Sequence, residues 1–322
     1  MHSELSNPFI ESERDRDNTA CIEKVFTFKR LIYLFFYINL LNYIERVVIG
    51  GSSEKILDFI RQAIVTGNEH TYYGALTSSF IIGFSIASVV FGYYVTKFPP
   101  FRVVSIGLIC WFLAALSSGL APNYWVLLMS RLVSGVGEAA FQIVIPSYIN
   151  DYSPKEKVGS SMAWLYAAIS IGTAIGFMGS GYISTYYSWR WSFLAVAPLI
   201  LPAIIILFYL NYNPTKEDQQ SFIHSTLQLL KSPVFVFGFL GEAFNVFICA
   251  AYNAFGNQLL IHLGFFHDEA TSSLVFGVVC VTAGIVGSIV GGATLNCLKI
   301  TDDTSTSRKL YIYSIHFGLL II

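Results

Sequence analysis

Charged residues are scarce in this chain. Only 12% of its 322 residues are Asp, Glu, Lys or Arg, against about 25% in soluble domains, while 54% are hydrophobic and the mean hydropathy is +0.60. The 19 basic and 20 acidic residues nearly cancel, leaving a net charge of −1, so the chain has no basic field of the kind that binds nucleic acid. The composition predicts a polytopic membrane protein embedded in the lipid bilayer and excludes nucleic acid as a partner.

Motifs for enzyme chemistry are also lacking. The five cysteines show neither metal-ligand nor redox spacing, and the six histidines are scattered through tail, loops and span ends. There is no G-x-S-x-G nucleophile elbow and no P-loop. We therefore expect no enzyme activity, no metal and no cofactor. The first thirty residues are too polar to contain a cleavable signal peptide, so the first apolar run must also direct membrane insertion.

Long apolar runs are what the chain has in abundance. A membrane-spanning helix needs about 20 mainly apolar residues. Eight runs meet this length, at 31–50, 72–96, 101–120, 123–149, 158–187, 191–211, 233–260 and 271–298. A ninth begins at Leu310, and at 1.5 Å per residue it reaches only about 20 Å before the sequence stops. We expect an all-α transmembrane protein with about eight full spans and a partial ninth, truncated at its C-terminus.

The distribution of basic residues predicts the orientation of these spans. With the N-terminus in the cytoplasm, fourteen of the nineteen Lys and Arg residues fall in cytoplasmic segments. The outer loops then hold only Lys55, Arg61 and Arg190. Because positively charged loops remain on the cytoplasmic side, this asymmetry predicts a cytoplasmic N-terminus.

The longest inner loop predicts the division into domains. We expect a cytoplasmic tail at 1–30, a six-helix bundle at 31–211, a cytoplasmic central loop at 212–232 and an incomplete second bundle at 233–322. Within the first bundle, the polar outer segment 51–71 is either a short interfacial helix or a plain surface loop. The helical spacing of its apolar residues favours the helix, and these residues are Ile56, Phe59, Ile60 and Ala63.

The fourth span carries charges inside the membrane. Arg131, Glu138 and Gln142 are spaced i, i+7 and i+11, which places them on one stripe of the helix, with Ser134 and Gly135 between them. A charge at mid-bilayer costs roughly 2.5–3.5 kcal/mol on insertion scales, so such residues usually face a water-filled pathway and a partner. We expect this stripe to face the interior of the bundle.

The first span has a similar arrangement. Asn39, Asn42 and Arg46 share one stripe, and Glu45 lies one turn from Asn42. Two helices thus each carry an acid, a base and an amide. Two interpretations remain open: the charges belong to a transport pathway, or they form an inert salt-bridge clamp that fixes helix register.

Two further features have both a functional and a structural interpretation. Glu242 is a third intramembrane acid, in the seventh span, and it either belongs to the pathway or is bonded to Asn245 or a neighbouring helix. Small residues recur every four positions in the fifth and eighth spans, a pattern that lets helix backbones touch. These residues are Ala168, Gly172, Gly176, Ser180 and Ser184 in the fifth span and Ala283, Gly287 and Gly291 in the eighth.

Several stretches resemble a known family. "GYYVTKFPPFR" after the second span, the Arg131–Gly135–Gly137 pattern and the glycine-rich fifth span are similar to the major facilitator superfamily. More narrowly, "NYIERVVIGG", "GVGEAAFQIVIPSYINDYSP", "AAISIGTAIGFMGSGYI", "WRWSF" and "SLVFGVVCVTAGIVGSIVGG" resemble, in order, the Spinster family of lysophospholipid and sphingolipid transporters. The similarity covers about residues 31–298.

The resemblance implies a fold and roles for particular residues. The fold would be two six-helix bundles with the substrate site at their interface and alternating access by rocking. The family's acid and arginine of the first span match Glu45 and Arg46, and its glutamate of the fourth matches Glu138, residues implicated in proton coupling and the conformational cycle. In the inner-gate loop Gly92, Lys97 and Arg102 fit the superfamily pattern, but Thr96 replaces its aspartate, which weakens a gate contact.

The resulting hypothesis is a proton-linked secondary transporter that moves a lipid-like amphiphile by alternating access. Its partners would be a lipid or amphiphilic substrate and protons. The expected location is a lysosomal or vacuolar membrane, or the plasma membrane. One alternative keeps the superfamily fold but transports sugar or another small organic solute. The other is a truncated membrane interaction protein that does not transport.

Overall fold

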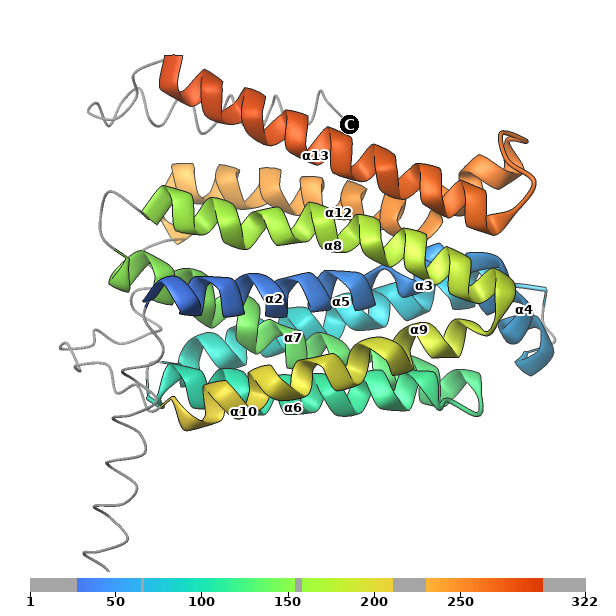
Figure 1. The fold of residues 1–322 in the computed structure, drawn as a ribbon, viewed down its shortest axis with the longest axis horizontal. Coiled ribbons are helices and arrows are strands. Elements are labelled where there is room, and N and C mark those ends of the chain that lie inside the picture. Colours follow the sequence, from blue (N-terminus) through green and yellow to red (C-terminus); the bar gives the residue numbers. More distant parts are fainter. Residues whose placement is uncertain (1–27, 65–66, 96, 154–157, 211–229, 298–322) are drawn as a thin grey trace, which may run out of the picture. The chain divides into compact units, whose positions relative to one another are not determined.

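The computed structural model describes residues 28–64, 67–95, 97–153, 158–210 and 230–297. Within these ranges the regular structure is helical and contains no β-strand, which confirms the predicted all-α class (Figure 1). Four predicted features lie outside the described residues: most of the N-terminal tail, Thr96, most of the central loop, and the run that begins at Leu310.

The long helices follow the predicted apolar runs to within a few residues. Six helical segments of the described chain are long and apolar enough to cross a membrane, and the described apolar part of α13 is shorter. The first helix, α2, has Lys29 and Arg30 near its start and Glu45 and Arg46 at its end. The long helices are α2 (Phe28–Arg46), α5 (Glu69–Tyr94), α6 (Pro100–Gly119), α7 (Tyr124–Tyr152), α8 (Val158–Tyr186), α12 (Pro233–His262) and α13 (Glu269–Cys297).

The first predicted span, 31–50, is not one continuous helix. The helix α2 ends at Arg46, and the chain continues as α3 (Val48–Gly51) and α4 (Ser53–Ala63). The backbone leaves helical geometry at Val47 (φ −93, ψ 1) and Ser52 (φ −114, ψ 33). β-branched residues, glycine and serine have lower helix propensity than alanine or leucine, so each residue of "VVIGGSS" slightly disfavours a continuous helix. The first five of these residues are not polar, so the apolar run in the sequence continues across the break.

The sixth predicted span, 191–211, is also interrupted. It consists of α9 (Trp189–Val196), a 3-10 turn η2 (Ala197–Ile200) and α10 (Leu201–Tyr209). Pro198 and Pro202 stand at the start of η2 and α10. Because proline has no backbone N–H and fits best in a first helical turn, the two prolines divide the segment there.

The described chain forms two compact units. The described residues of unit 1 lie within 28–42, 79–169 and 194–210, and those of unit 2 lie within 43–78, 170–193 and 230–297. The helices α2, α5, α8 and α9 contribute residues to both units. The division into two helical bundles, 31–211 and 233–322, stays a prediction.

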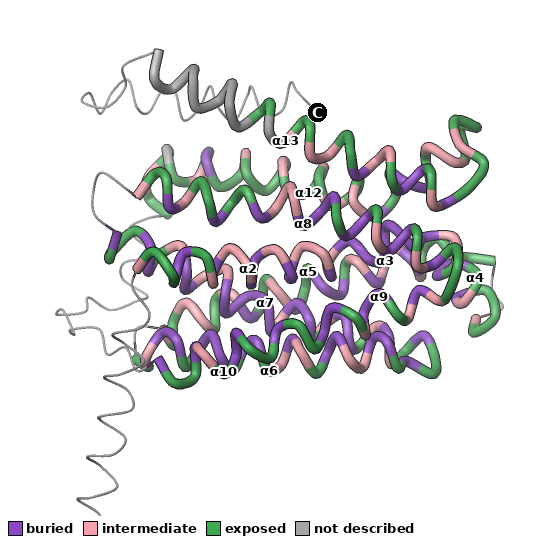
Figure 2. The backbone as a smooth tube through the Cα atoms, in the orientation of Figure 1, coloured by how far each residue is buried: buried purple, intermediate pink, exposed green. Residues whose placement is uncertain are grey.

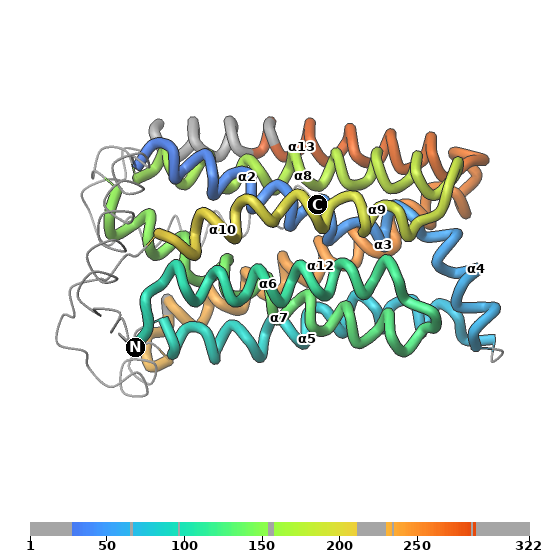
Figure 3. The backbone as a smooth tube through the Cα atoms, turned by 60° about the horizontal axis from the view of Figure 1, so that its bottom comes forward, coloured from blue at the N-terminus to red at the C-terminus, as the bar shows by residue number. Residues whose placement is uncertain are grey.

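The core of unit 1 depends on close packing between α6 and α7, which lie side by side in two views of the backbone (Figures 1 and 3). A Cβ atom on Gly137 would lie 2.5 Å from the backbone nitrogen of Trp111 and 2.6 Å from the carbonyl oxygen of Gly107. Trp111 is fully buried beside this contact. The six candidate spans differ in how many residues of their 18-residue apolar stretch are buried. This share is highest in α7, at 61%, and lowest in α12, at 6% (Figure 2).

The core of unit 2 is built around the break in the first span. Tyr73 on α5 is fully buried and donates its hydroxyl proton toward the carbonyl oxygens of Ile49 (3.0 Å) and Ala254 (2.8 Å). Ser273 on α13 donates to the carbonyl oxygen of Gly51 at 3.0 Å. Side chains from neighbouring helices therefore bond the carbonyl groups of α3, which is too short to satisfy them all itself.

The helix α4 confirms the helical interpretation of the outer segment. Ile56, Leu57 and Ile60 form its buried face. Of the other two residues in the predicted apolar face, Phe59 is half-buried and Ala63 is exposed. The buried face of α4 thus contains Leu57 and not the predicted Ala63, because Leu57 lies next to Ile56 and one turn before Ile60. A position at the membrane interface stays a prediction.

The contact between α6 and α7 predicts a stability effect at Gly137. A Gly137→Ala substitution places a methyl group against backbone atoms that cannot move independently of their helices, so we expect a loss of about 1–3 kcal/mol. Thermal unfolding of the detergent-solubilised protein measures it as a lower Tm. Gly179→Ala in α8 is the matched control, because nothing lies within 4 Å of the Cβ it would add. Equal Tm values for the two variants would contradict the packing described here.

Candidate functional site

The charged stripe predicted on the fourth span is buried on α7. Arg131 is 2% exposed and Glu138 is fully buried, and Ser134 and Gly135 between them are buried as well. Gln142 at the end of the stripe is half-buried. All five residues belong to unit 1. Their burial shows that the stripe formed by the i, i+7, i+11 spacing faces the interior of this unit.

A chain of amide groups connects Glu138 to two other helices. The Gln142 side-chain N–H donates to the Asn39 oxygen Oδ1 at 2.8 Å and lies 3.5 Å from the Glu138 oxygen Oε1. The Asn39 nitrogen Nδ2 in turn donates to the carbonyl oxygen of Leu165 on α8 at 2.8 Å. The network joins α2, α7 and α8 within unit 1 and presents Glu138 with a donor that is itself held in place.

Arg131 is held against the aromatic face of α5. Its guanidinium carbon lies 5.1 Å from the ring centroid of Phe80, within cation–π range. The same part of α5 approaches α7 closely, since a Cβ on Gly135 would lie 2.1 Å from the carbonyl oxygen of Phe80. The glycine therefore lets the two backbones meet where Arg131 lies over the ring.

Asn42 differs from Asn39, although both lie on α2 and both are fully buried. Neither the nitrogen nor the oxygen of the Asn42 amide has a hydrogen-bond partner among the described residues. An unsatisfied buried polar group costs about 1–3 kcal/mol. A side chain kept there at such a cost is a candidate contact for a transported molecule or for a second conformation.

Glu45 and Arg46, the predicted acid–base pair of the first span, lie at the C-terminal end of α2 and belong to unit 2. Glu45 is fully buried. The guanidinium of Arg46 lies 4.7 Å from the ring centroid of Tyr43 and donates to the Tyr43 hydroxyl at 3.4 Å. The pair stands directly before the helix break at Val47.

The predicted inner-gate residues lie at the end of α5, in the turn that follows it and at the start of α6, all in unit 1. The Lys97 ammonium donates to the hydroxyl of Tyr93, one turn earlier, and lies 4.3 Å from the centroid of that ring. Arg102 is exposed in the first turn of α6. Around Gly92, no atom lies within 4 Å of the position a Cβ would take. Glycine at that position is not explained by packing within the described residues.

The remaining candidate acid, Glu242 on α12, is exposed. Its neighbour Asn245 accepts a weak hydrogen bond from the Cys249 thiol at 3.8 Å. Both interpretations of Glu242, a pathway residue or a structural one, therefore stay open.

The small residues of the fifth span do form a contact surface. A Cβ on Gly176 would lie 2.4 Å from Val47 Cγ2, and the Ser180 carbonyl oxygen accepts a bond from the Ser52 hydroxyl at 3.2 Å. In α13 the contact positions differ from those predicted. Gly277 and Gly284 face α8, whereas Ala283 and Gly287 are exposed.

Sequence reasoning missed a polar cluster in unit 2. Glu269 at the start of α13 is 8% exposed, and Asn257 on α12 is fully buried. Asn257 donates toward the Gly50 carbonyl at 3.5 Å and toward the Ser53 hydroxyl at 3.4 Å. Glu269 lies just outside the apolar run 271–298, and an acid at the start of a helix is common. The sequence offered no signal that it would be buried.

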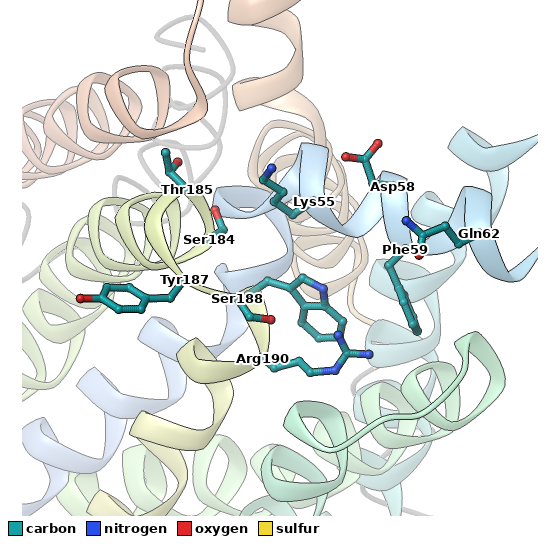
Figure 4. Close-up of a pocket in the computed structure, with 10 residues that line it drawn as sticks. Lys55, Asp58, Phe59, Gln62, Ser184, Thr185, Tyr187, Ser188 and Arg190 are labelled. Atoms are coloured by element: carbon teal, nitrogen blue, oxygen red, sulfur yellow. The ribbon is translucent and has the colours of Figure 1, made fainter.

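A surface cavity of about 340 Å³ lies in unit 2, between α4 and the turn from α8 to α9 (Figure 4). The Arg190 guanidinium lies 4.6 Å from the Trp189 ring centroid and 5.1 Å from that of Phe59. The cavity contains none of the predicted site residues. It is lined by Lys55, Asp58, Phe59, Gln62, Ser184, Thr185, Tyr187, Ser188, Trp189 and Arg190.

Comparison with solved structures shows the fold. A bacterial homolog of the human lysosomal transporter Spinster, in an inward-facing and occupied conformation, superposes with a TM-score of 0.67 and 19% identity, over 85% of this chain and 62% of that one. A D-xylose–proton symporter superposes with a TM-score of 0.68 and 16% identity, over 83% of this chain and 69% of that one. The predicted transporter fold is confirmed.

Relatives by sequence are Spinster-type proteins. A probable sphingolipid transporter, spinster homolog 2 of Arabidopsis thaliana, is 27% identical over 98% of this chain and 71% of its own length. The sphingosine-1-phosphate transporter SPNS2 of Danio rerio is 26% identical over 80% of this chain and 54% of its own length. This chain therefore spans between about half and about seven-tenths of these two relatives.

The family model supplies the broader assignment. The model of the Major Facilitator Superfamily matches residues 35–321, which is most of the chain. The chain is a multi-pass integral membrane protein, and the resemblance seen in its motifs is confirmed. It belongs to the major facilitator superfamily, whose members are membrane transporters rather than enzymes, and it is similar over most of its length to Spinster-type proteins.

Proposed function

We propose that this chain carries out proton-linked secondary transport of a lipid-like amphiphile, of the lysophospholipid or sphingolipid class, by alternating access. The observation that carries the proposal is the environment of Glu138. This carboxyl group is fully buried on α7 and is connected through Gln142 to Asn39 on α2. A buried carboxyl group that can exchange a proton would couple the charge of the pathway to its conformation.

The network offers a reason why protonation would matter. When Glu138 is ionised, it attracts the amide N–H of Gln142 and the field of Arg131 on the same stripe. When it is protonated, both attractions weaken, and Gln142 remains bonded to Asn39 alone. The proton therefore changes the strength of a contact between α7 and α2 within unit 1.

The substrate class is supported by the relatives. Several curated relatives are described as sphingolipid or sphingosine-1-phosphate transporters, at 25–27% identity. Aromatic side chains give no independent support. Tyr73 and Phe255 pack on each other with ring centroids 5.4 Å apart, and Tyr166 and Tyr252 are exposed.

Two other functions are alternatives to proton-linked lipid transport. Transport of a sugar or another small organic solute is compatible with the fold, because the xylose–proton symporter superposes as well as the Spinster homolog does. A membrane interaction protein that does not transport is the other alternative. Flux measurements with a lysophospholipid, a sphingolipid and a sugar separate the three.

We further propose that the N-terminus is cytoplasmic and that the protein resides in a lysosomal or vacuolar membrane or in the plasma membrane. The distribution of basic residues supports the orientation, with α4 then on the non-cytoplasmic side and the end of α7 on the cytoplasmic side.

The orientation predicts the labelling of two exposed positions. Gln62→Cys, on α4, should react with a membrane-impermeant maleimide in intact cells that carry the protein in the plasma membrane. Asp151→Cys, at the end of α7, should react only after permeabilisation. Both residues are exposed, so accessibility on the correct side does not limit the reaction. The parent chain provides the background from native cysteines, and the reverse pattern would show that the orientation is wrong.

Asn42 predicts opposite changes in stability and transport. Asn42→Leu removes an unsatisfied buried amide, so we expect the Tm to rise, with a gain of about 1 kcal/mol. If the amide contacts the transported molecule, substrate flux falls at the same time. Asn39→Leu is the matched control, since it breaks two hydrogen bonds and should lower the Tm. Normal flux in the Asn42→Leu protein would remove Asn42 from the pathway.

Glu138 predicts the loss of proton coupling. Glu138→Gln mimics the protonated acid in shape, so flux of a labelled lysophospholipid or sphingolipid into proteoliposomes should no longer depend on a pH gradient. The increase in flux that the gradient causes should fall by about 10-fold or more. Downhill exchange should continue. Asp151→Asn, an exposed carboxylate on the same helix, should leave the gradient dependence unchanged. Gradient-driven flux at the normal rate in the Glu138→Gln protein would leave Glu138 as a structural clamp.

A further inference from the structure

Glu269 is a buried acid for which the proposed transport pathway has no role. It is the first residue of α13 and precedes the predicted span 271–298. Its side chain lies in unit 2 and only 8% of the residue is exposed. A carboxyl group is rarely buried to this extent unless it is paired or hydrogen-bonded.

The carboxyl group connects α13 to two other helices. Its oxygen Oε1 accepts the backbone N–H of Glu54 at 2.7 Å and lies 3.4 Å from the Ser53 hydroxyl, both in the first turn of α4. Its oxygen Oε2 accepts the Ser184 hydroxyl, at the end of α8, at 3.1 Å. One side chain therefore holds the starts of α13 and α4 and the end of α8 together.

The contact also completes the N-terminus of α4. The first backbone N–H groups of a helix have no acceptor inside the helix, and a side chain usually caps them. The N-cap residue of α4, Ser52, makes no such side-chain bond. Glu269 supplies the missing acceptor from another helix, and the positive end of the α4 dipole favours a negative charge there.

One titratable neighbour of Glu269, the side chain of Glu54, opposes its ionisation. Glu54 adds a second carboxyl group, whose oxygen Oε1 is buried with no hydrogen-bond partner among the described residues. The phenol of Tyr73 on α5 lies within electrostatic range of both acids. On α8 the group that faces Glu269 is the Ser184 hydroxyl, and Lys55, the next residue on α4, is exposed.

Burial has the largest effect on the pKa of Glu269. The pKa of Glu269 is raised from an ordinary value of 4.5 to about 7. Desolvation raises it most and the charge of Glu54 also raises it, while the bonds from the Glu54 N–H and the two serine hydroxyls lower it. A group whose pKa is higher in the packed arrangement than in water stabilises that arrangement in acid. This contribution is fully present below pH 4.5 and is lost as the pH rises through about 7.

We infer that Glu269 is a second proton-binding site, whose protonated form holds α13 against α4 and α8 and whose ionised form favours their separation. Its role in transport rests on the proposed function, in which these helix ends lie on the non-cytoplasmic side. A proton taken from the water on that side neutralises the carboxylate and favours closure there. In alternating access, closure on one side precedes release on the other, so an acidic outer compartment would drive the cycle inward.

Hydrogen exchange at the start of α4 tests the inference directly. The Glu54 N–H is protected by Glu269 and exchanges when the contact opens. From the two pKa values, the equilibrium constant for opening should rise about 10-fold between pH 6 and pH 8. The measurement is mass-spectrometric exchange of the peptide that covers residues 53–57, with the protein in lipid nanodiscs. Dividing the wild-type rate by that of Glu269→Gln at each pH cancels the intrinsic pH dependence of exchange.

Asp268→Asn is the matched control. Asp268 is exposed and its carboxylate accepts the backbone N–H of Thr271 at 2.7 Å, which lowers its pKa. It therefore stays ionised from pH 6 to pH 8, and the ratio of wild-type to variant exchange should not change with pH. A constant ratio for Glu269→Gln as well would overturn the inference.

Two milder substitutions test the same inference if Glu269→Gln does not fold. Glu54→Gln removes a negative charge that raises the pKa of Glu269, so the midpoint of opening should move to lower pH. Ser184→Ala removes a donor that stabilises the ionised form, so the midpoint should move to higher pH. Shifts in the same direction, or none, would contradict the inference. Since no substrate is involved, the result is independent of the outcome of the Glu138→Gln flux experiment.

Discussion

A carboxyl group inside an apolar helical protein must be hydrogen-bonded, paired or protonated, because hydrocarbon cannot replace the water it gives up. This constraint organises the polar interior of the chain. Glu138 receives a donor that α2 holds in place, Asn39 bonds a backbone carbonyl of α8, and Arg131 lies over an aromatic ring of α5. Each contact crosses between helices, so these polar groups also determine which helices meet within unit 1.

The same constraint acts on the backbone. Where the first span breaks between Arg46 and Ser53, the carbonyl groups of Ile49, Gly50 and Gly51 in α3 accept hydrogen bonds from donors on other helices. Tyr73, Asn257 and Ser273 supply them. Glycine at positions 50 and 51 allows this approach, since a Cβ there would lie 1.9 Å from the Asn253 carbonyl oxygen and 2.0 Å from the Ser180 hydroxyl. Broken helices at buried, polar positions are typical of transporter folds.

The sequence predicted the helices well and their partners poorly. Apolar runs give the positions of α5 to α8, α12 and α13 within a few residues, because insertion requires a minimum length of apolar chain. The break at Val47 was not predicted, since the residues around it remain apolar. The inward stripe on α7 follows from helical spacing, but the pairing of Gln142 with Asn39 depends on packing between distant segments. Glu269 was missed because the groups that bond its carboxylate lie on α4 and α8, far from it in the sequence.

The central claim is that Glu138 binds and releases a proton within this network. Infrared difference spectra between acidic and alkaline pH measure the C=O stretch of protonated carboxyl groups directly. We expect a carboxyl band that titrates in the wild-type protein, is absent in Glu138→Gln and shifts in frequency in Gln142→Leu, where the neighbouring N–H donor is lost. A spectrum that is identical in the wild type and in Glu138→Gln would contradict the claim.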